Sequence, residues 1–259
     1  MALGTVMLAS GGLAAACMVA LWVASVRLAD ASIVDVFWGP GFAAIAWISV
    51  AMAGPAPRGL LLALLATAWG TRLGLHIAAR RRGQGEDRRY RAMREARGRR
   101  FAAESLLSVF LLQAGLLWVV SLPLQAGASL GRARPLGPVE LAGSALFLVG
   151  LAFEAIGDAQ LSRFLRDPGN GGRVMQRGLW RYTRHPNYFG DFLVWWGLGC
   201  ISLGTGAAWP LVGPAVMSVL LLRVSGVTLL ERTIGQRRPE YASYARRTSA
   251  FFPWPPRQR

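Results

Sequence analysis

The stretch IVDVFWGPGFAAIAWISVAMA, Ile33–Ala53, decides the class of fold, because it is long enough to cross a bilayer and holds a single charged residue, Asp35. A transmembrane helix needs roughly 20 predominantly apolar residues. The chain offers six further runs of this kind, at residues 3–26, 60–79, 106–122, 139–156, 189–203 and 208–230. The sequence therefore predicts an all-α integral membrane protein with about seven transmembrane helices.

The composition agrees with this class. Of the 259 residues, 53% are hydrophobic and 16% charged, which excludes a disordered chain and is unlike a soluble domain. The formal net charge of +16 would suit a nucleic-acid-binding protein, but arginines placed between apolar runs of bilayer length are better explained by a membrane. The first run lacks the basic start and cleavage site of a signal peptide, so we expect it to be a span. Cys17 and Cys200 lie in apolar runs, and neither a disulfide framework nor a metal site is implied.

The distribution of arginine predicts the orientation. Of the 29 basic residues, ten lie within residues 80–100, six within residues 163–184, and most of the rest after the last apolar run. By the positive-inside rule these three regions face the cytoplasm. With seven spans, the N-terminus is then expected outside and the C-terminus in the cytoplasm. The sequence shows no internal repeat or linker, so we predict a single membrane domain over residues 1–259.

Polar and ionisable side chains interrupt the predicted spans. A charge at the bilayer centre costs about 2.5–3.5 kcal/mol on insertion scales, so such residues are functional candidates by default. The set consists of Asp35, Arg72 with His76, Gln113, Glu154 with Asp158, Asn187 with Asp191, and Arg223 with Glu231. We expect most of them to line a polar cavity open to the cytoplasmic side. For any one pair, such as Asp35 with Arg72, a purely structural ion pair is the alternative.

The densest polar motif is GLWRYTRHPNYFGD, residues 178–191, directly before and into the sixth apolar run. Because proline favours the first helical position, the sixth helix is predicted to begin at Pro186 with His185 as its cap. The positive end of that helix would form an anion site suited to phosphate. Further groups approach from the flanking segments, namely Arg163, Arg166, Arg173, Arg177, Arg181, Arg184, Tyr241, Tyr244, Arg246 and Arg247. A lipid-headgroup site is the alternative, but Asn187 and Asp191 one turn apart favour a shaped ligand.

At these residues the chain resembles the C-terminal domain of the steroid 5-alpha-reductase family, in its bacterial branch. The resemblance extends to Asp35-Val36-Phe37-Trp38-Gly39, to Glu86-Asp87-Arg88-Arg89-Tyr90, to Glu154 with Asp158, and to residues 241–253, and so covers nearly the whole chain. It implies a monomeric seven-helix enzyme of the bacterial inner membrane that binds NADPH from the cytoplasmic side. The implied reaction reduces the carbon–carbon double bond of an enone, such as a 3-oxo-4-ene steroid. The N-terminal helices would hold the substrate, and residues 139–259 the cofactor.

The resemblance also assigns cofactor-binding positions. Carried over residue by residue, these are Asp158, Arg166, Arg173, Tyr182, Asn187, Asp191 and Glu231, with Arg163 as a rival to Arg166. The polar faces and the motif before the sixth helix complete the predicted set with Glu154, Arg184, His185, Tyr188, Arg223, Tyr241, Tyr244 and Arg247.

The chemistry of enone reduction requires a donor at the ketone oxygen. Hydride attacks the carbon distal to the carbonyl, so negative charge develops on that oxygen, and a donor placed there stabilises the transition state. In the family an acid of the second span acts with a tyrosine of the third. Asp35 fits the acid, either protonated or orienting another donor. The tyrosine has no clear match: Trp69 falls nearest, and His76 and Tyr90 are alternative donors.

Two other functions compete with the reductase. A membrane methyltransferase of the isoprenylcysteine or phospholipid type also resembles arginine-histidine-proline before a tyrosine at a helix start, and would bind S-adenosylmethionine. It offers no evident role for Asp35 or for the long basic loop after the third span. A small transporter or lipid-binding protein would use the intramembrane charges as a path, but the chain shows no inverted halves.

Overall fold

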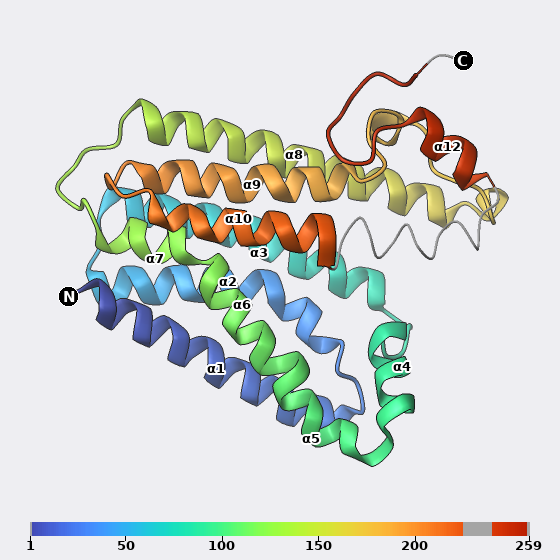
Figure 1. The fold of residues 1–259 in the computed structure, drawn as a ribbon, viewed down its shortest axis with the longest axis horizontal. Helices are drawn as coiled ribbons and strands as arrows, with labels where there is room; N and C mark the ends of the chain where they lie inside the picture. Colours follow the sequence, from blue (N-terminus) through green and yellow to red (C-terminus); the bar gives the residue numbers. More distant parts are fainter. Residues whose placement is uncertain (1, 225–239, 258–259) are drawn as a thin grey trace. The chain divides into compact units, whose positions relative to one another are not determined.

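The computed structural model describes residues 2–224 and 240–257, and the chain divides into two compact units. Unit 1 comprises residues 1–140 and 201–212, and unit 2 comprises residues 141–200 and 213–259. In the described residues the regular structure is helical, apart from one isolated parallel bridge between Thr183 and Ser249 (Figure 1). Helices long and apolar enough to span a membrane make this a multi-pass membrane protein.

Unit 1 is built around three long helices. These are α1 (Leu3–Leu28), α2 (Ile33–Ala53) and α3 (Pro57–Arg81). A series of helical segments follows: α4 (Arg88–Arg97), a 3-10 turn (Gly98–Arg100), α5 (Phe101–Ser105), a π-helical segment (Leu106–Leu111) and α6 (Leu112–Val120). The short α7 (Leu122–Ser129) and a 3-10 turn (Trp209–Leu211) complete the unit.

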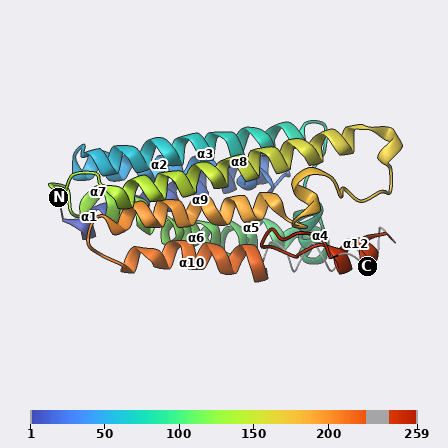
Figure 2. The same cartoon turned by 90° about the horizontal axis from the view of Figure 1, so that it is seen from above.

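Unit 2 pairs two long helices, α8 (Pro138–Arg166) and α9 (Pro186–Leu203). Figures 1 and 2 both show the two running side by side, with α8 continuing beyond the start of α9. Shorter elements are the 3-10 turns Pro168–Asn170 and Gly178–Arg181, α10 (Val212–Val219) with a π-helical segment (Leu220–Val224), and α12 (Tyr241–Arg247).

Five of the expected spans are present as long apolar helices among the described residues. They are Leu3–Leu28, Ile33–Ala53, Pro57–Arg81, Arg88–Val120 and Pro138–Arg166. The expected sixth span is α9, which begins with polar turns, and the expected seventh begins as the shorter apolar helix Trp209–Val224. The prediction of an all-helical membrane protein is confirmed, whereas the count of seven, the orientation and the polar cavity stay predictions.

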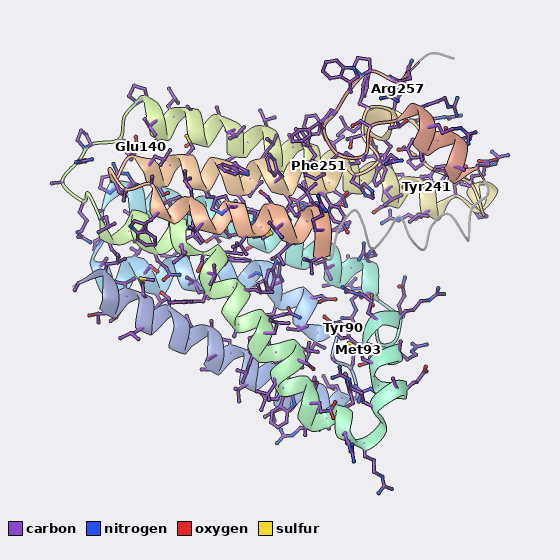
Figure 3. All side chains as sticks on the ribbon, viewed as in Figure 1. Tyr90, Met93, Glu140, Tyr241, Phe251 and Arg257 are labelled. Carbon is purple, nitrogen blue, oxygen red and sulfur yellow. The ribbon has the colours of Figure 1, made fainter. Side chains whose placement is uncertain are left out.

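The basic segment after α3, predicted as a long loop, instead contains α4. The carboxylate of Asp87 caps this helix by accepting a hydrogen bond from the Arg89 amide at 2.9 Å. Tyr90 is buried, and Figure 3 shows Tyr90 and Met93 on the side of α4 turned toward the other helices of unit 1. Arginine favours helices almost as well as alanine, so a polar run with a cap and one buried tyrosine forms a helix that an apolar pattern does not reveal.

A buried ion pair fastens the opposite end of α3. Arg58 is 2% exposed, and its guanidinium bonds to Glu140 at 2.8 and 2.9 Å and to the carbonyl of Gly131 at 3.0 Å. The second oxygen of Glu140 accepts the amide of Gly137 at 2.8 Å. Each charge therefore has its partners, which is the condition under which a buried ion pair is tolerated.

Glycine allows α2 and α3 to touch backbone to backbone. A Cβ built on Gly39 would lie 2.4 Å from the carbonyl oxygen of Gly70, and one on Gly70 would lie 2.3 Å from that of Gly39. Small residues at such crossings let membrane helices gain dispersion contacts that larger side chains prevent.

We predict that Gly70→Ala separates these two helices and lowers the thermal unfolding midpoint in detergent, with a loss of about 1–3 kcal/mol from overpacking. Gly115→Ala on α6 is the matched control, because a Cβ there meets nothing within 4 Å and the change only improves helix propensity. Equal midpoints for the two variants would contradict this view of the α2–α3 contact.

Candidate functional site

The polar centre of unit 1 is formed by Asp35 and the residues of α4. Asp35 lies in the first turn of α2, and the Tyr90 hydroxyl donates to its Oδ1 at 2.9 Å. The Arg89 guanidinium bonds to its Oδ2 at 2.8 Å. The amide of Gln113 donates to the Tyr90 oxygen at 3.3 Å, so the phenol oxygen is held from both sides. An acid, a tyrosine and an arginine are thereby gathered at one end of an apolar helix.

The segment before α4 is fixed to the loop between α1 and α2. The carboxylate of Glu86 accepts the Ala31 amide at 2.8 Å and two bonds from the Arg94 guanidinium at 2.8 and 2.9 Å. The Asp87 amide donates to the Ser32 hydroxyl at 3.0 Å. Two-point attachment of this kind restricts α4, and with it the position of Tyr90.

A second ion pair closes the same loop onto α3. Arg81, in the last turn of α3, bonds to the Asp30 carboxylate at 2.8 and 3.1 Å, and it also donates to the carbonyl of Ser32. Asp30 in turn accepts the Ser32 amide at 2.9 Å. The start of α2, where Asp35 lies, is therefore tied to both α3 and α4.

Two further groups before α4 carry shifted pKa values. Burial acts to raise the pKa of Glu86, but the hydrogen bonds from Arg94 and the Ala31 amide outweigh it and hold that pKa below the ordinary value. Burial also acts to raise the pKa of Asp87, but the hydrogen bonds from the Arg89 amide and side chain outweigh it and hold that pKa below the ordinary value. A carboxyl with a lowered folded pKa stabilises the protein above its ordinary pKa, and that contribution is lost as the pH falls through the folded value.

We therefore predict that Glu86→Gln lowers the thermal midpoint at pH 7, by a loss of about 1 kcal/mol, and makes it less sensitive to acid below pH 4.5, the ordinary pKa of the group. The thermal unfolding midpoint of the detergent-solubilised protein, measured between about pH 3 and 7, shows both the loss at neutral pH and the weaker dependence on acid. Glu95→Gln, which neutralises an exposed carboxylate on α4 itself, is the control. Parallel pH profiles for wild type and Glu86→Gln would show that this group does not anchor α4.

The other predicted donors of unit 1 lie on α3. Trp69 is fully buried, and its ring centroid is 5.8 Å from that of Phe42 on α2. His76 is half-buried, two turns further along. Of the three donors named from the sequence, Tyr90 is the one whose bond to Asp35 the structure describes.

The polar centre of unit 2 lies where α9 begins against α8. Glu154 and Asp158 on α8 are buried, and the Asn187 amide donates to Asp158 Oδ1 at 3.3 Å. His185 is also buried and stacks on Tyr188, with ring centroids 5.6 Å apart. Asp191 is half-buried one turn beyond Asn187. The predicted cofactor set therefore has an inner group in which Glu154, Asp158 and His185 are buried and the Asn187 side chain bonds to Asp158.

The start of α9 is confirmed at Pro186. The sequence suggested that this helix end is open as an anion site, but α8 packs against it. A Cβ on Gly157 would lie 3.2 Å from the Pro186 ring and 3.3 Å from the Asn187 amide nitrogen. The first turn of α9 thus packs on α8 at Gly157, and the backbone nitrogen of Asn187 lies against that helix.

A segment from near the C-terminus, residues 240–257, is bound to the turn before α9. The Arg184 amide donates to the carbonyl of Ser249 at 2.9 Å, and the Thr183 hydroxyl donates to the carbonyl of Phe251 at 2.7 Å. In the other direction, the Trp254 amide donates to the carbonyl of Tyr182 at 3.0 Å. The Tyr244 hydroxyl donates to the carbonyl of Trp180 at 2.5 Å. Tyr241 and Tyr244 are both buried, so they pack this segment onto unit 2.

The arginines of the predicted set form an outer, exposed group. Arg184 is half-buried and donates to the carbonyl of Ala245 at 3.2 Å, and Arg247 donates to the Gln176 side chain at 3.3 Å. The remaining members that the structure describes are exposed: Arg163, Arg166, Arg173, Tyr182 and Arg223. Glu231 lies outside the described residues.

Tyr90 was named from the sequence as a possible donor, but Arg89 was missed as a partner of Asp35, and Glu86 was missed as the anchor of α4. Arg72 was named from the sequence as an example of a structural ion-pair partner for Asp35, whereas the ion pair that the structure describes is with Arg89. The signal was present in Glu86-Asp87-Arg88-Arg89-Tyr90, where an acidic cap precedes an arginine and a tyrosine. Gln113 was recognised as polar within a span, but its contact with Tyr90 depends on the folding back of α4.

A family profile described as Protein of unknown function (DUF1295) matches residues 21–248, and the chain belongs to this family. A search of the curated proteins gave no match, and neither did a search of the solved structures.

Proposed function

We propose that this protein is an NADPH-dependent membrane reductase that reduces the carbon–carbon double bond of an enone, with a 3-oxo-4-ene steroid as the substrate class. The observation that carries the proposal is the hydrogen bond from Tyr90 to Asp35. An acid paired with a tyrosine is what the resemblance to the steroid 5-alpha-reductase family calls for, and the sequence alone left the tyrosine open. Here it comes from α4.

The geometry favours Tyr90 as the donor and Asp35 as the group that orients it. One oxygen of Asp35 is paired with the Arg89 guanidinium, and the other accepts the hydrogen bond from the Tyr90 hydroxyl. Gln113 holds the phenol oxygen from the other side. In the proposed reaction the Tyr90 hydroxyl turns to the ketone oxygen and stabilises the charge that develops there.

The residues of unit 2 fit a cofactor that carries both hydroxyl groups and phosphates. Carboxylates such as Glu154 and Asp158 accept hydrogen bonds from ribose hydroxyls or a carboxamide, and arginine forks bind phosphate oxygens. The inner group would hold the nucleoside parts, and the exposed Arg166 and Arg173, with the half-buried Arg184, would hold the phosphates. When bound, NADPH supplies the hydride for the carbon distal to the carbonyl, while a proton adds to the carbon beside it and NADP⁺ is released.

The direct test follows NADPH absorbance after a 3-oxo-4-ene steroid is added to the purified protein in lipid. Steroid-dependent loss of NADPH, with the saturated ketone as product, supports the proposal. Thermal stabilisation by S-adenosylmethionine but not by NADPH, without oxidation, would overturn it.

We predict that Tyr90→Phe lowers the rate of steroid reduction by about 10²-fold and leaves NADPH affinity unchanged, because it removes the donor to the ketone oxygen and keeps the ring. Asp35→Asn should lower the rate in the same way. Single-turnover rates and NADPH titrations separate the two effects. Trp69→Phe is the comparison: a loss of rate there, with Tyr90→Phe fully active, would assign the donor to Trp69.

We predict the opposite pattern for unit 2. Asn187→Ala and Arg173→Ala should raise the NADPH dissociation constant about tenfold, since each removes a hydrogen bond to the cofactor worth about 1–2 kcal/mol. Binding is measured by the quenching of protein fluorescence. Arg134→Ala removes an exposed arginine of unit 1 and should bind NADPH as wild type does. Unchanged affinity in both unit 2 variants would place the cofactor elsewhere.

The second candidate is an S-adenosylmethionine-dependent methyltransferase of the isoprenylcysteine or phospholipid type. The observation in its favour is the buried pair of Glu154 and Asp158 on α8, because carboxylates also attract a sulfonium cation. It leaves the Asp35, Tyr90 and Arg89 cluster without a chemical role. We therefore rank it below the reductase.

A further inference from the structure

The segment after α12 ends in an exposed aromatic tip. Phe251 is buried, but Phe252 is 60% exposed and Trp254 is 71% exposed. Prolines at positions 253, 255 and 256 restrict the backbone around them. We call residues 252–257 the aromatic tip. Two large aromatic side chains held open on a rigid segment indicate a contact surface.

The tip lies at the level where α9 begins. The Phe252 ring centroid is 6.0 Å from the rings of both Phe189 and Phe192, and that of Phe251 is 5.9 and 5.6 Å from the same two rings. Figure 3 shows Phe251 beside the start of α9. Phe192 lies six residues after Pro186, which corresponds to about 9 Å along a helix axis. The tip therefore packs on the first two turns of α9.

The same level marks the end of the apolar surface of α8. The Phe189 ring is 5.3 Å from that of Phe153 on α8, a helix with the length and hydropathy of a membrane span. Leu148, Val149 and Ile156 of α8 are large, apolar and exposed, as expected for a surface that faces lipid chains. Beyond Ile156 charged residues appear at Asp158, Arg163 and Arg166, with Leu165 exposed among them. Phe252 and Trp254 are thus placed near the boundary between lipid chains and headgroups.

Arginines accompany the aromatic side chains at the tip. The Arg257 amide donates to the carbonyl of Arg247 at 3.0 Å, which brings these two exposed residues together. Arg246 is exposed beside them. Tryptophan with arginine is the combination that partitions to a membrane interface, where the ring sits among the headgroups and the guanidinium binds lipid phosphate.

We propose that the aromatic tip is a membrane-interface anchor that binds anionic lipid. Phe252 and Trp254 insert at the headgroup boundary of the leaflet nearest the start of α9, and Arg247 and Arg257 bind the phosphates of anionic lipids. Because residues 249, 251 and 254 bond to the turn before α9, the anchor holds that turn at the membrane surface. This inference does not depend on the reaction that the protein catalyses.

The test is a depth measurement with a spin label in lipid nanodiscs. In a Cys17→Ser, Cys200→Ser background, Trp254→Cys carries the label, and Ala242→Cys on the exposed side of α12 carries it in the control. The label at position 254 should collide more with oxygen than with a water-soluble nickel chelate, and more so in phosphatidylglycerol than in phosphatidylcholine. The label at position 242 should favour the chelate in both lipids.

Two results would overturn the anchor. One is a label at position 254 that is as accessible to the nickel chelate as the control, and the other is a label shielded from both reagents, as in a contact with protein. A second measurement needs no spin label, and so it tests the proposal even if the label disturbs the fold. Trp254→Phe should remove a component of tryptophan fluorescence that lipids brominated near the headgroup quench, and Arg247→Ala with Arg257→Ala should weaken that quenching in phosphatidylglycerol. Identical quenching in wild type and Trp254→Phe would contradict the proposal.

Discussion

A carboxylate at the start of an apolar helix is the constraint on which unit 1 depends. Asp35 interrupts the apolar sequence of α2, and an uncompensated charge within a span costs about 2.5–3.5 kcal/mol. The cost is offset because Arg89 and Tyr90 both bond to the carboxylate. Those two partners come from a highly basic segment that must fold into α4 and return to α2. The attachment of Glu86 to Ala31 and Arg94 makes that return specific.

Unit 2 meets the same problem with other means. Its buried carboxylates, Glu154 and Asp158, lie where α8 and α9 approach closely, and glycine makes that approach possible. A Cβ on Gly190 would lie 2.5 Å from the Glu154 amide nitrogen. Asn187, in the first turn of α9, donates to one of these carboxylates, that of Asp158. Arginines such as Arg163, Arg166 and Arg173 remain exposed around them.

Much of this arrangement could be predicted from local sequence. The bounds of α2 followed from the length of its apolar run, and the start of α9 followed from Pro186. Asp35 was identified as a candidate because a charge stands out in an apolar helix. Local patterns of this kind are decided within a few residues, and so they can be read directly.

The remainder depends on contacts between distant residues. Tyr90 was one of three alternative donors. It is 55 residues away from Asp35 in the sequence, and spacing alone does not show that α4 folds back to bring the two together. The cover over the first turn of α9 was missed for the same reason, since it comes from Gly157 on another helix. Five long apolar helices were clear, and α9 was expected as the sixth span from the apolar run at residues 189–203, although Asn187 and Asp191 make its first turns polar.

The central claim is that this membrane protein transfers hydride from NADPH to an enone. The most direct measurement uses NADPH deuterated at the transferred position of the nicotinamide, with a 3-oxo-4-ene steroid and the wild-type protein in lipid. The account predicts a saturated ketone that carries deuterium on the carbon distal to the carbonyl, as seen by mass spectrometry and NMR. A steroid recovered unreduced, or a reduced product without deuterium at that carbon, would contradict it.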